Sequence, residues 1–554
     1  MSLDTPSRPA PGRRRSGIGR PATVREAAYE VLRERGLTTM FANPGSTEVP
    51  FLVGLPEDFE FVLALHEGSV VGMATGWALA RSEPALVLLH TTAGLGNAVG
   101  ALATARVNRA PLVVVVGQQD RRHLAFEPFL AGRLEGLAGS YPVRVDQPVR
   151  AQDVPAAIDR AWHEATTHAG PALVIVPMDD WVASPTVDAE KASPGTVLRA
   201  AAADPAAVGA LAAELEASRS PAIVVGAGAD EPETRSALVA LAERLDAPVW
   251  QESFGARAGF PQDHPLFAGH LPADRPRLRE VLSPHDVVLV VGAPVFRQYP
   301  FTPGRLVLEG TRVLLVASDP NEVHRSPADL ALLAPPASAC AALAELVPAR
   351  EARPRPPREI VRLGPPEAGE PLRAVHVLDA LAERLPTQAI LVEESPSSRP
   401  DLHARVPAVS HLGFVSAAMG GLGFALPGAI GLRMGAPDRP VVAVVGDGSS
   451  LYAIQSLWSA GRYRVGALFV VLQNRGYAVM DHLADQHGGG DAPWPELDGV
   501  DVVGLAQALS CPARAVTTYG ELVGVLDEVI PTLAGRDEPL LLGVTVARDA
   551  TFQP

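Results

Sequence analysis

The chain has 554 residues, of which 47% are hydrophobic and 20% charged, a balance typical of a globular protein with about three domains. Its net charge of −15 excludes a broad positive field for nucleic acid or an anionic membrane surface. No apolar run approaches the roughly 20 residues of a membrane-spanning helix, so we predict no membrane span. The two cysteines, Cys340 and Cys511, are far apart, which argues against a disulfide framework and favours the reducing cytoplasm.

The chain begins with residues 1–20, which are rich in Pro, Gly and Arg and lack the apolar segment of a secretory signal. We interpret them as a disordered tail, with a weak anion-binding arm as the alternative. A first helix is predicted next. Thr23 and Glu26 form a capping-box pattern at its start, and Gly36 marks its end.

Short, continuous apolar runs then alternate with helical patterns, as expected for parallel strands buried on both faces by crossover helices. The alternation restarts twice. It predicts an α/β protein of three doubly wound parallel-sheet domains at residues 21–185, 200–347 and 372–550. A Pro- and Arg-rich linker, residues 348–371, separates the last two.

Three segments of the first domain carry polar residues suited to chemistry. They are FANPGSTEVPFL with Ser46, ALHEGSVVGMATGWALA with Glu67, and LVLLHTTAGLGNAVGAL with His90 and Asn97. Each has a local explanation as well. Ser46 suits a Pro-Gly turn, Glu67 suits the positive end of a helix, and His90 can be a satisfied histidine at a strand end.

The strongest motif lies in the last domain. One buried strand ends in Gly446-Asp447-Gly448-Ser449, and the next ends in Gln473-Asn474-Arg475-Gly476, with Asp447 and Asn474 27 positions apart. Both tips face one crevice at the carboxyl edge of a parallel sheet. A carboxylate, an amide oxygen and a backbone carbonyl there can hold a hard cation, and glycines let amides approach phosphate. Two ordinary helix-capping turns are the alternative.

This pair of turns resembles the signature of enzymes that bind thiamine diphosphate (ThDP) and Mg²⁺, and the whole ordered chain is similar to the benzoylformate decarboxylase family. The resemblance implies a pyrimidine-binding domain, a central domain and a diphosphate-binding domain, in chain order. It implies that Asp447, Asn474 and the Gly476 carbonyl bind Mg²⁺. The cofactor contacts that it implies around them are Gly446, Gly448, Ser449 and Tyr477.

The same resemblance gives roles to the first domain. Glu67 would hydrogen-bond the aminopyrimidine of ThDP and so promote deprotonation of the thiazolium. Ser46 would bind the substrate carboxylate, and His90 would act as acid and base on its carbonyl oxygen. Asn97 belongs to the glycine-rich turn beside the cofactor.

Two further segments complete the implied cofactor site. In SAAMGGLGFALPGAIG, Leu422 would support the bent shape of ThDP, and the Gly420 carbonyl would accept from its 4′-amino group. In VEESPSSRP, Ser397 would contact the diphosphate, although Pro396 stands where the family has a hydroxyl residue.

The central domain carries the most informative departure from the family. In GAPVFRQYPFTPG, Tyr299 occupies the position of the family's second active-site histidine. A phenol is a poor proton relay near neutral pH, although it can donate a hydrogen bond. Val479, Met480 and Leu483 also change the implied aromatic wall of the substrate pocket, which stays apolar.

These observations favour non-oxidative decarboxylation of a 2-oxo acid, with a benzoylformate-like aryl or other apolar side chain, to an aldehyde and CO₂. A carboligase resembling acetolactate synthase is one alternative, and a ThDP-binding protein with lost or altered activity is another. Family analogy implies a homodimer at least, with a homotetramer expected and active sites between subunits. The single Gly-Ala-Gly at 226–228 is weak evidence for a flavin, and we expect none.

Overall fold

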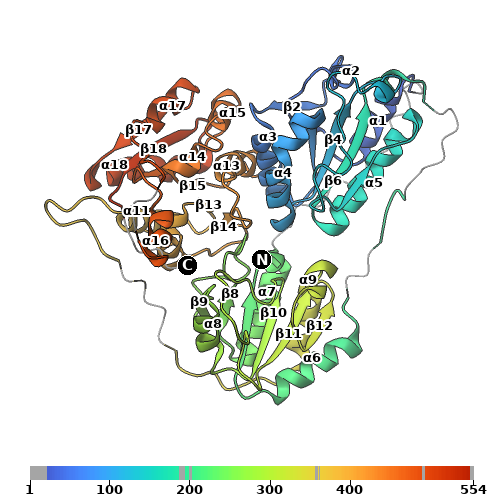
Figure 1. Ribbon diagram of the computed structural model, residues 1–554. Helices are drawn as coiled ribbons and strands as arrows, with labels where there is room; N and C mark the ends of the chain where they lie inside the picture. The colour runs from blue at the N-terminus through green and yellow to red at the C-terminus, as the bar shows by residue number, and fades with distance from the viewer. Residues whose placement is uncertain are drawn as a thin grey trace, which may run out of the picture.

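A computed structural model of the chain describes residues 21–185, 194–198, 202–355, 360, 362–489 and 493–548. The predicted tail, residues 1–20, lies outside them. The described chain forms three α/β units, each built on a six-stranded sheet in which all neighbouring strands are parallel. Figure 1 shows the N-terminal and C-terminal units side by side, with the central unit below both.

The sheet of the N-terminal unit has the strand order β2-β1-β3-β4-β6-β5. Its strands are β1 (Thr39–Ala42), β2 (Glu60–Leu63), β3 (Ala85–His90), β4 (Leu112–Gln118), β5 (Arg144–Asp146) and β6 (Pro171–Pro177). Its helices are α1 (Val24–Glu34), α2 (Val49–Leu52), α3 (Glu67–Arg81), α4 (Thr91–Val107) and α5 (Val154–His168).

The sheet of the central unit has the order β12-β11-β10-β7-β8-β9. Its strands are β7 (Pro221–Val225), β8 (Val249–Gln251), β9 (Phe267–His270), β10 (Val287–Val291), β11 (Arg312–Ala317) and β12 (Leu330–Leu333). Its helices are α6 (Pro205–Ala217), α7 (Pro232–Leu245), α8 (Arg275–Leu282), α9 (Pro320–His324) and α10 (Pro336–Leu346).

The sheet of the C-terminal unit has the order β14-β13-β15-β16-β18-β17. Its strands are β13 (Ile390–Glu394), β14 (Phe414–Ser416), β15 (Val441–Gly446), β16 (Leu468–Gln473), β17 (Ala513–Val516) and β18 (Leu540–Thr545). Its helices are α11 (Ala374–Ala382), α12 (Arg399–Arg405), α13 (Ala425–Gly435), α14 (Asp447–Ser450), α15 (Ser456–Arg462), α16 (Ala478–Gln486), α17 (Val502–Ala508) and α18 (Tyr519–Val529).

The central strands of each sheet are buried along their whole length, because helices cover both faces. Strands β4, β7 and β10 expose none of their residues, which is the pattern of a doubly wound parallel sheet. The predicted fold class is therefore confirmed. Both cysteines are buried and unpaired. No helix among the described residues has the length and apolar character needed to span a membrane.

The N-terminal and C-terminal units share one hydrophobic core through a close crossing of α3 and α13. A Cβ atom on Gly76 would lie 2.1 Å from the Gly428 carbonyl oxygen, and one on Gly431 would lie 1.8 Å from the Met73 carbonyl oxygen. The two helix backbones therefore touch, and only glycine fits at these positions. Figure 1 shows α3 and α13 meeting at the boundary of the two units.

Helix α1 corrects one detail of the sequence prediction. Thr23 caps it as expected, with its hydroxyl accepting from the Glu26 amide at 3.2 Å. The predicted return bond to Thr23 is wrong, because the Glu26 carboxylate reaches one residue further back and accepts from the Ala22 amide at 2.6 Å. That amide lies outside any helix or strand, so the bond satisfies it.

Candidate active site

The carboxyl edge of the N-terminal sheet brings three predicted residues together. Ser46 follows β1, Glu67 follows β2, and His90 ends β3. These strands are neighbours in the order β2-β1-β3, so their tips lie at one edge of the sheet. Parallel α/β sheets bind ligands at this edge.

Glu67 is the first residue of α3 and is only 7% exposed. The Asn43 side-chain amide donates to one carboxylate oxygen at 3.0 Å, and the Asn97 amide donates to the other at 3.0 Å. Two fixed donors therefore hold the carboxylate in one orientation. Asn97 was predicted beside the site, whereas Asn43 was missed. Asn43 directly follows β1, and this position at the carboxyl end of a strand could have identified it from the sequence.

His90 is oriented by a buried carboxylate that sequence reasoning also missed. Its Nδ1 lies 2.9 Å from Oε2 of Glu48 and 3.0 Å from the Thr47 hydroxyl. Oε2 of Glu48 also accepts from the Gly45 amide at 2.7 Å. The Nε2 atom of His90 makes no hydrogen bond within the described chain and remains available. This arrangement fixes which ring nitrogen can act on another molecule.

The loop between β1 and α2 is shaped around this histidine. A Cβ atom on Gly45 would lie 2.5 Å from the His90 ring, so any other residue there would displace the ring. Ser46 is exposed, and its hydroxyl has no partner among the described residues. The loop therefore presents one free hydroxyl beside an oriented imidazole.

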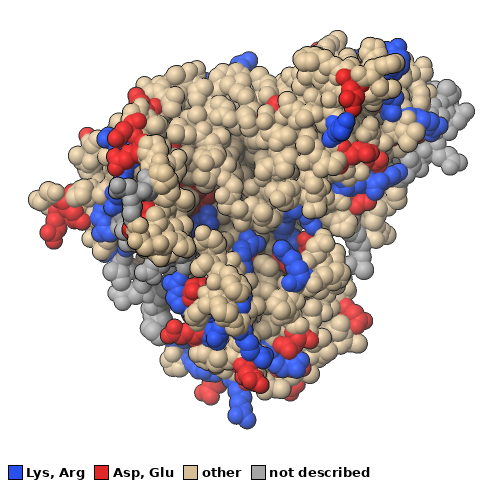
Figure 2. Space-filling view, in the orientation of Figure 1, with Lys and Arg blue, Asp and Glu red and all other residues tan. Residues whose placement is uncertain are grey.

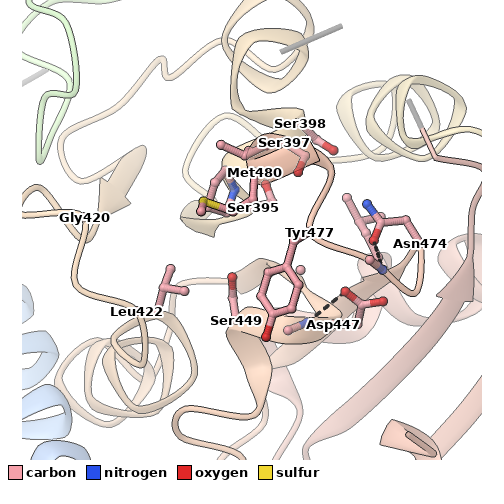
Figure 3. Close-up of a pocket in the computed structure, with 16 residues that line it drawn as sticks. Ser395, Ser397, Ser398, Gly420, Leu422, Asp447, Ser449, Asn474, Tyr477 and Met480 are labelled. Carbon is pink, nitrogen blue, oxygen red and sulfur yellow. Dashed lines mark hydrogen bonds between the residues drawn. The ribbon is translucent and has the colours of Figure 1, made fainter. Parts of the chain in front are cut away.

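The carboxyl edge of the C-terminal sheet holds a cavity of about 240 Å³. Figure 3 shows Gly420 and Leu422 on one side of it, Asp447 and Asn474 on the other, and Ser395, Ser397 and Ser398 along a third. Every cofactor-binding and metal-binding residue predicted in the C-terminal unit lines it. The full lining is Ser395, Pro396, Ser397, Ser398, Gly420, Leu422, Gly446, Asp447, Gly448, Ser449, Leu472, Asn474, Gly476, Tyr477, Val479 and Met480.

Asp447 is a buried carboxylate without a cationic partner in the described part of the chain. Burial raises its pKa above the ordinary value, whereas the Arg475 and Gly448 amides, which donate at 2.7 and 2.8 Å, lower it. None of the cavity's lining residues is cationic. The Asn474 amide oxygen, which accepts from the Gly476 amide at 3.1 Å, lines the same cavity as Asp447. A carboxylate without a cationic partner and an amide oxygen in one cavity are a donor set that fits Mg²⁺.

The turn at residues 395–398 contains Pro396, which stands where the family has a hydroxyl residue. Pro396 lines the cavity and offers neither a hydroxyl nor an amide N–H. Ser395, Ser397 and Ser398 line the same wall. The Ser395 hydroxyl donates to Oε1 of Glu393 at 3.5 Å, so the hydroxyls of Ser397 and Ser398 remain available to a phosphate group on this side.

Two predicted features lie away from this cavity. None of its lining residues comes from 21–185, so Glu67, His90 and Ser46 are not part of it within one chain. Tyr299 is 49% exposed, and its ring packs edge-on against Phe254 with centroids 6.4 Å apart. Of the predicted apolar wall, Val479 and Met480 line the cavity and Leu483 does not.

The glycine loop of the central unit is bonded within the protein. The Gly226 amide donates to Val291 at 3.3 Å, and the Gly228 amide donates to Gly292 at 2.8 Å. Glu252 lies beneath the loop, and burial raises the pKa of Glu252 to about 7. The absence of a flavin stays a prediction.

Comparison with known protein families assigns each of the three units. Residues 22–137 match the thiamine pyrophosphate enzyme N-terminal TPP binding domain, residues 208–343 match the central domain, and residues 403–544 match the C-terminal TPP binding domain. The three units and their order along the chain are thus those of the thiamine diphosphate enzyme class.

Similarity to individual proteins shows which members of this enzyme class the chain resembles. A benzoylformate decarboxylase from Pseudomonas aeruginosa is 39% identical over 94% of this chain and 98% of its own length. The structure of a 4-hydroxybenzoylformate decarboxylase from Rhodococcus jostii RHA1 matches with a TM-score of 0.90 and 36% identity, over 96% of this chain and all of that one. An acetolactate synthase large subunit from Escherichia coli is 25% identical, over 91% of this chain and 92% of its own length. The chain therefore belongs to the family of thiamine diphosphate-dependent decarboxylases, and it is an enzyme.

Proposed function

We propose that this enzyme decarboxylates a 2-oxo acid with an aryl or other apolar side chain to an aldehyde and CO₂, using ThDP and Mg²⁺. The observation that carries the proposal is the cavity around Asp447 and Asn474, where a buried carboxylate has no cationic partner in the described chain. The similarity to benzoylformate decarboxylases supports the class of substrate.

In this proposal the C-terminal unit binds the charged end of the cofactor. Asp447, the Asn474 side chain and the Gly476 carbonyl hold Mg²⁺, which compensates both the buried carboxylate and the diphosphate. Ser397 donates to the diphosphate from the opposite wall. Val479 and Met480 give the cavity an apolar side, which suits an apolar substrate and helps to exclude water.

When bound, ThDP supplies the nucleophile and the electron sink for loss of CO₂. The N-terminal unit supplies the protein groups. Glu67, held by two asparagines, binds the aminopyrimidine. His90 exchanges a proton with the substrate oxygen through Nε2, and the Ser46 hydroxyl binds the substrate carboxylate. Tyr299 is assigned only a hydrogen-bonding role.

We call Ser46, Glu67 and His90 the N-terminal half-site and the cavity around Asp447 and Asn474 the C-terminal half-site. The proposed active site forms between two subunits, because these half-sites do not share one cavity within a chain. A homodimer is then the smallest active unit, and we expect a homotetramer. In Figure 2 the N-terminal and C-terminal units present a broad face with few charged side chains, whereas charges crowd the central unit below. A weakly charged face of this kind suits contact with a second copy. A cytoplasmic location stays a prediction.

The test is analysis of CO₂ and organic products with ThDP, Mg²⁺ and a panel of 2-oxo acids from pyruvate to phenyl-substituted acids. The wild type is compared with Glu67→Ala. We expect cofactor-dependent aldehyde from an aromatic acid, lost in the variant. Sedimentation of the loaded enzyme, run in parallel, gives its oligomeric state, and a monomer with full activity would contradict the shared site.

Other outcomes of the same panel separate the alternatives. A hydroxyketone as the main product would assign the enzyme as a carboligase, which the similarity to acetolactate synthases makes a real competitor. Binding of ThDP with no turnover of any acid would instead indicate that Tyr299 and Pro396 have redirected or abolished the activity.

A further inference from the structure

Strand β13 ends in two consecutive carboxylates, Glu393 and Glu394, that are 0% and 2% exposed. Sequence reasoning gave neither of them a role. Consecutive residues of a strand point to opposite sides of the sheet. The pair therefore sits behind the cavity at the carboxyl edge, with one side chain directed to each of two neighbouring turns.

Glu394 accepts three backbone hydrogen bonds at the start of α13. The Gly423 amide donates to Oε1 at 2.7 Å, and the Phe424 and Ala425 amides donate to Oε2 at 2.8 and 2.7 Å. Amides in the first turn of a helix have no partner within the helix, and the helix dipole favours a negative charge there. Glu394 thus fixes where α13 begins.

Leu422 lies immediately before these three amides and lines the cavity. The turn that carries it is otherwise weakly held. The Gly420 amide donates to Ala417 at 2.8 Å, and within the described chain the amides of Gly421 and Leu422 donate no hydrogen bond. Gly420 and Gly423, on either side of Leu422, have φ values of +68° and +101°. The position of the Leu422 side chain therefore depends on the anchor that Glu394 provides.

Glu393 holds the opposite wall of the cavity. Its Oε1 accepts from the Ser395 amide at 2.7 Å, and its Oε2 lies 2.7 Å from Nη2 of Arg399. These two contacts bracket the serine turn, which is closed by the Ser398 amide donating to the Ser395 carbonyl at 2.9 Å. Serines 395, 397 and 398 all face the cavity.

We propose that Glu393 and Glu394 are positioning residues with separate tasks. Glu393 sets the serine wall that meets the diphosphate, and Glu394 sets Leu422, which meets the middle of the cofactor and controls its bound shape. The inference rests on the proposed function. Beyond that function, the inference assigns affinity for the diphosphate to Glu393 and reactivity of the bound cofactor to Glu394.

The test compares Glu393→Gln and Glu394→Gln by calorimetry with Mg²⁺ plus ThDP and with Mg²⁺ plus inorganic pyrophosphate. Deuterium exchange at C2 of bound ThDP is followed by NMR. Measurements are made at pH 8, because burial raises the pKa of Glu394 to about 7. Glu252→Gln is the matched control, since Glu252 is an equally buried carboxylate of the central unit.

We expect Glu393→Gln to weaken both ThDP and pyrophosphate by about tenfold or more, because a charge-assisted contact is lost at the serine wall. Glu394→Gln should leave pyrophosphate binding within about twofold and slow C2 exchange at saturating ThDP by about tenfold or more. Its retained pyrophosphate binding also reports an intact fold. Glu252→Gln should change none of these quantities.

Leu422→Ala and the double variant test whether Glu394 acts through Leu422. The double variant should exchange no more slowly than Glu394→Gln alone, because both changes remove the same support. Additive losses, or normal exchange in Glu394→Gln, would overturn the inference. If Glu394→Gln does not fold, Glu394→Asp replaces it, and normal exchange in that variant would also overturn the inference. A wild type that binds neither ThDP nor pyrophosphate would reject the proposed function itself.

Discussion

The two half-sites of this enzyme are built in opposite ways. At the N-terminal sheet, Glu67 and His90 are each fixed by other side chains, two asparagines for the first and Glu48 with Thr47 for the second. At the C-terminal sheet, the key carboxylate, Asp447, contacts only backbone amides and has no cationic partner in the described chain.

This difference teaches which half is complete before a ligand arrives. The N-terminal groups have partners that define their orientation, which is the preorganisation that the proposed proton transfer requires. In the C-terminal half, Asp447 has no cationic partner among the described residues, and under the proposed function Mg²⁺ supplies one. Substitution of Glu67 or Glu48 should therefore lower turnover, whereas substitution of Asp447 should lower the affinity for the cofactor.

The largest expected effect comes from the C-terminal half. Asp447→Asn removes the charge while keeping an oxygen that can accept from the Gly448 or Arg475 amide. We expect the Mg²⁺-dependent affinity for ThDP to fall by about 100-fold or more. Calorimetric titration of ThDP at fixed Mg²⁺ measures it. Unchanged affinity would mean that Asp447 does not bind the metal.

The corresponding change in the N-terminal half is Glu67→Gln. It should lower kcat by roughly 10²- to 10⁴-fold, the range for a group that assists proton transfer, while ThDP affinity stays within a few fold. Steady-state kinetics and cofactor titration on one preparation give both numbers. If affinity fell as far as kcat, the contrast between the two halves would be lost.

A smaller effect on kcat is expected from substitution of Glu48, which contacts Nδ1 of His90 and not the Nε2 atom that would meet the substrate. Glu48→Gln should reduce kcat by about 10- to 100-fold, because the imidazole loses its fixed orientation, with no change in ThDP affinity. Thr47→Val is the comparison variant: it removes the other contact to Nδ1 and the hydrogen bond that the Thr47 hydroxyl donates to Glu48, but keeps the carboxylate charge. A smaller loss of kcat in Thr47→Val than in Glu48→Gln would show that the carboxylate itself orients His90, and an unchanged kcat in Glu48→Gln would contradict that role.

Glu252 lies outside both half-sites. Its substitution should have the smallest effect on activity and the clearest effect on stability. Burial raises the pKa of Glu252 from 4.5 to about 7, so between these values the native state binds more protons than the unfolded state. Stability therefore falls as pH rises through this window. Relative to Glu252→Gln, the wild type should lose about 3 kcal/mol of unfolding free energy between pH 5 and 8. Denaturant unfolding at several pH values tests this, and parallel curves would refute it.

The sequence predicted the C-terminal half-site better than the N-terminal one. Asp447, Asn474 and the glycines beside them follow strands in recognisable turns, so a local pattern locates them. Asn43 and Glu48 were missed because their importance lies in which side chains they reach after folding. Glu393 and Glu394 were missed for the same reason, since hydrogen bonds to backbone amides leave no mark in residue spacing.

The fold was predictable because buried strands and their crossover helices have regular hydrophobic patterns. What the pattern could not give was the contact between units. Gly72, Gly76 and Gly431 looked like ordinary small residues of two separate helices. Only the structure shows that they form a crossing without space for a side chain.

That crossing has a mechanical consequence. Helix α3 begins at Glu67, and α13 begins just after Leu422, so one rigid pair of helices carries a residue from each kind of half-site. If the sites form between subunits as proposed, these residues serve two different reaction centres. A displacement at one active site would then move the α3–α13 pair and reach the other active site, so the two active sites of the dimer would be mechanically coupled.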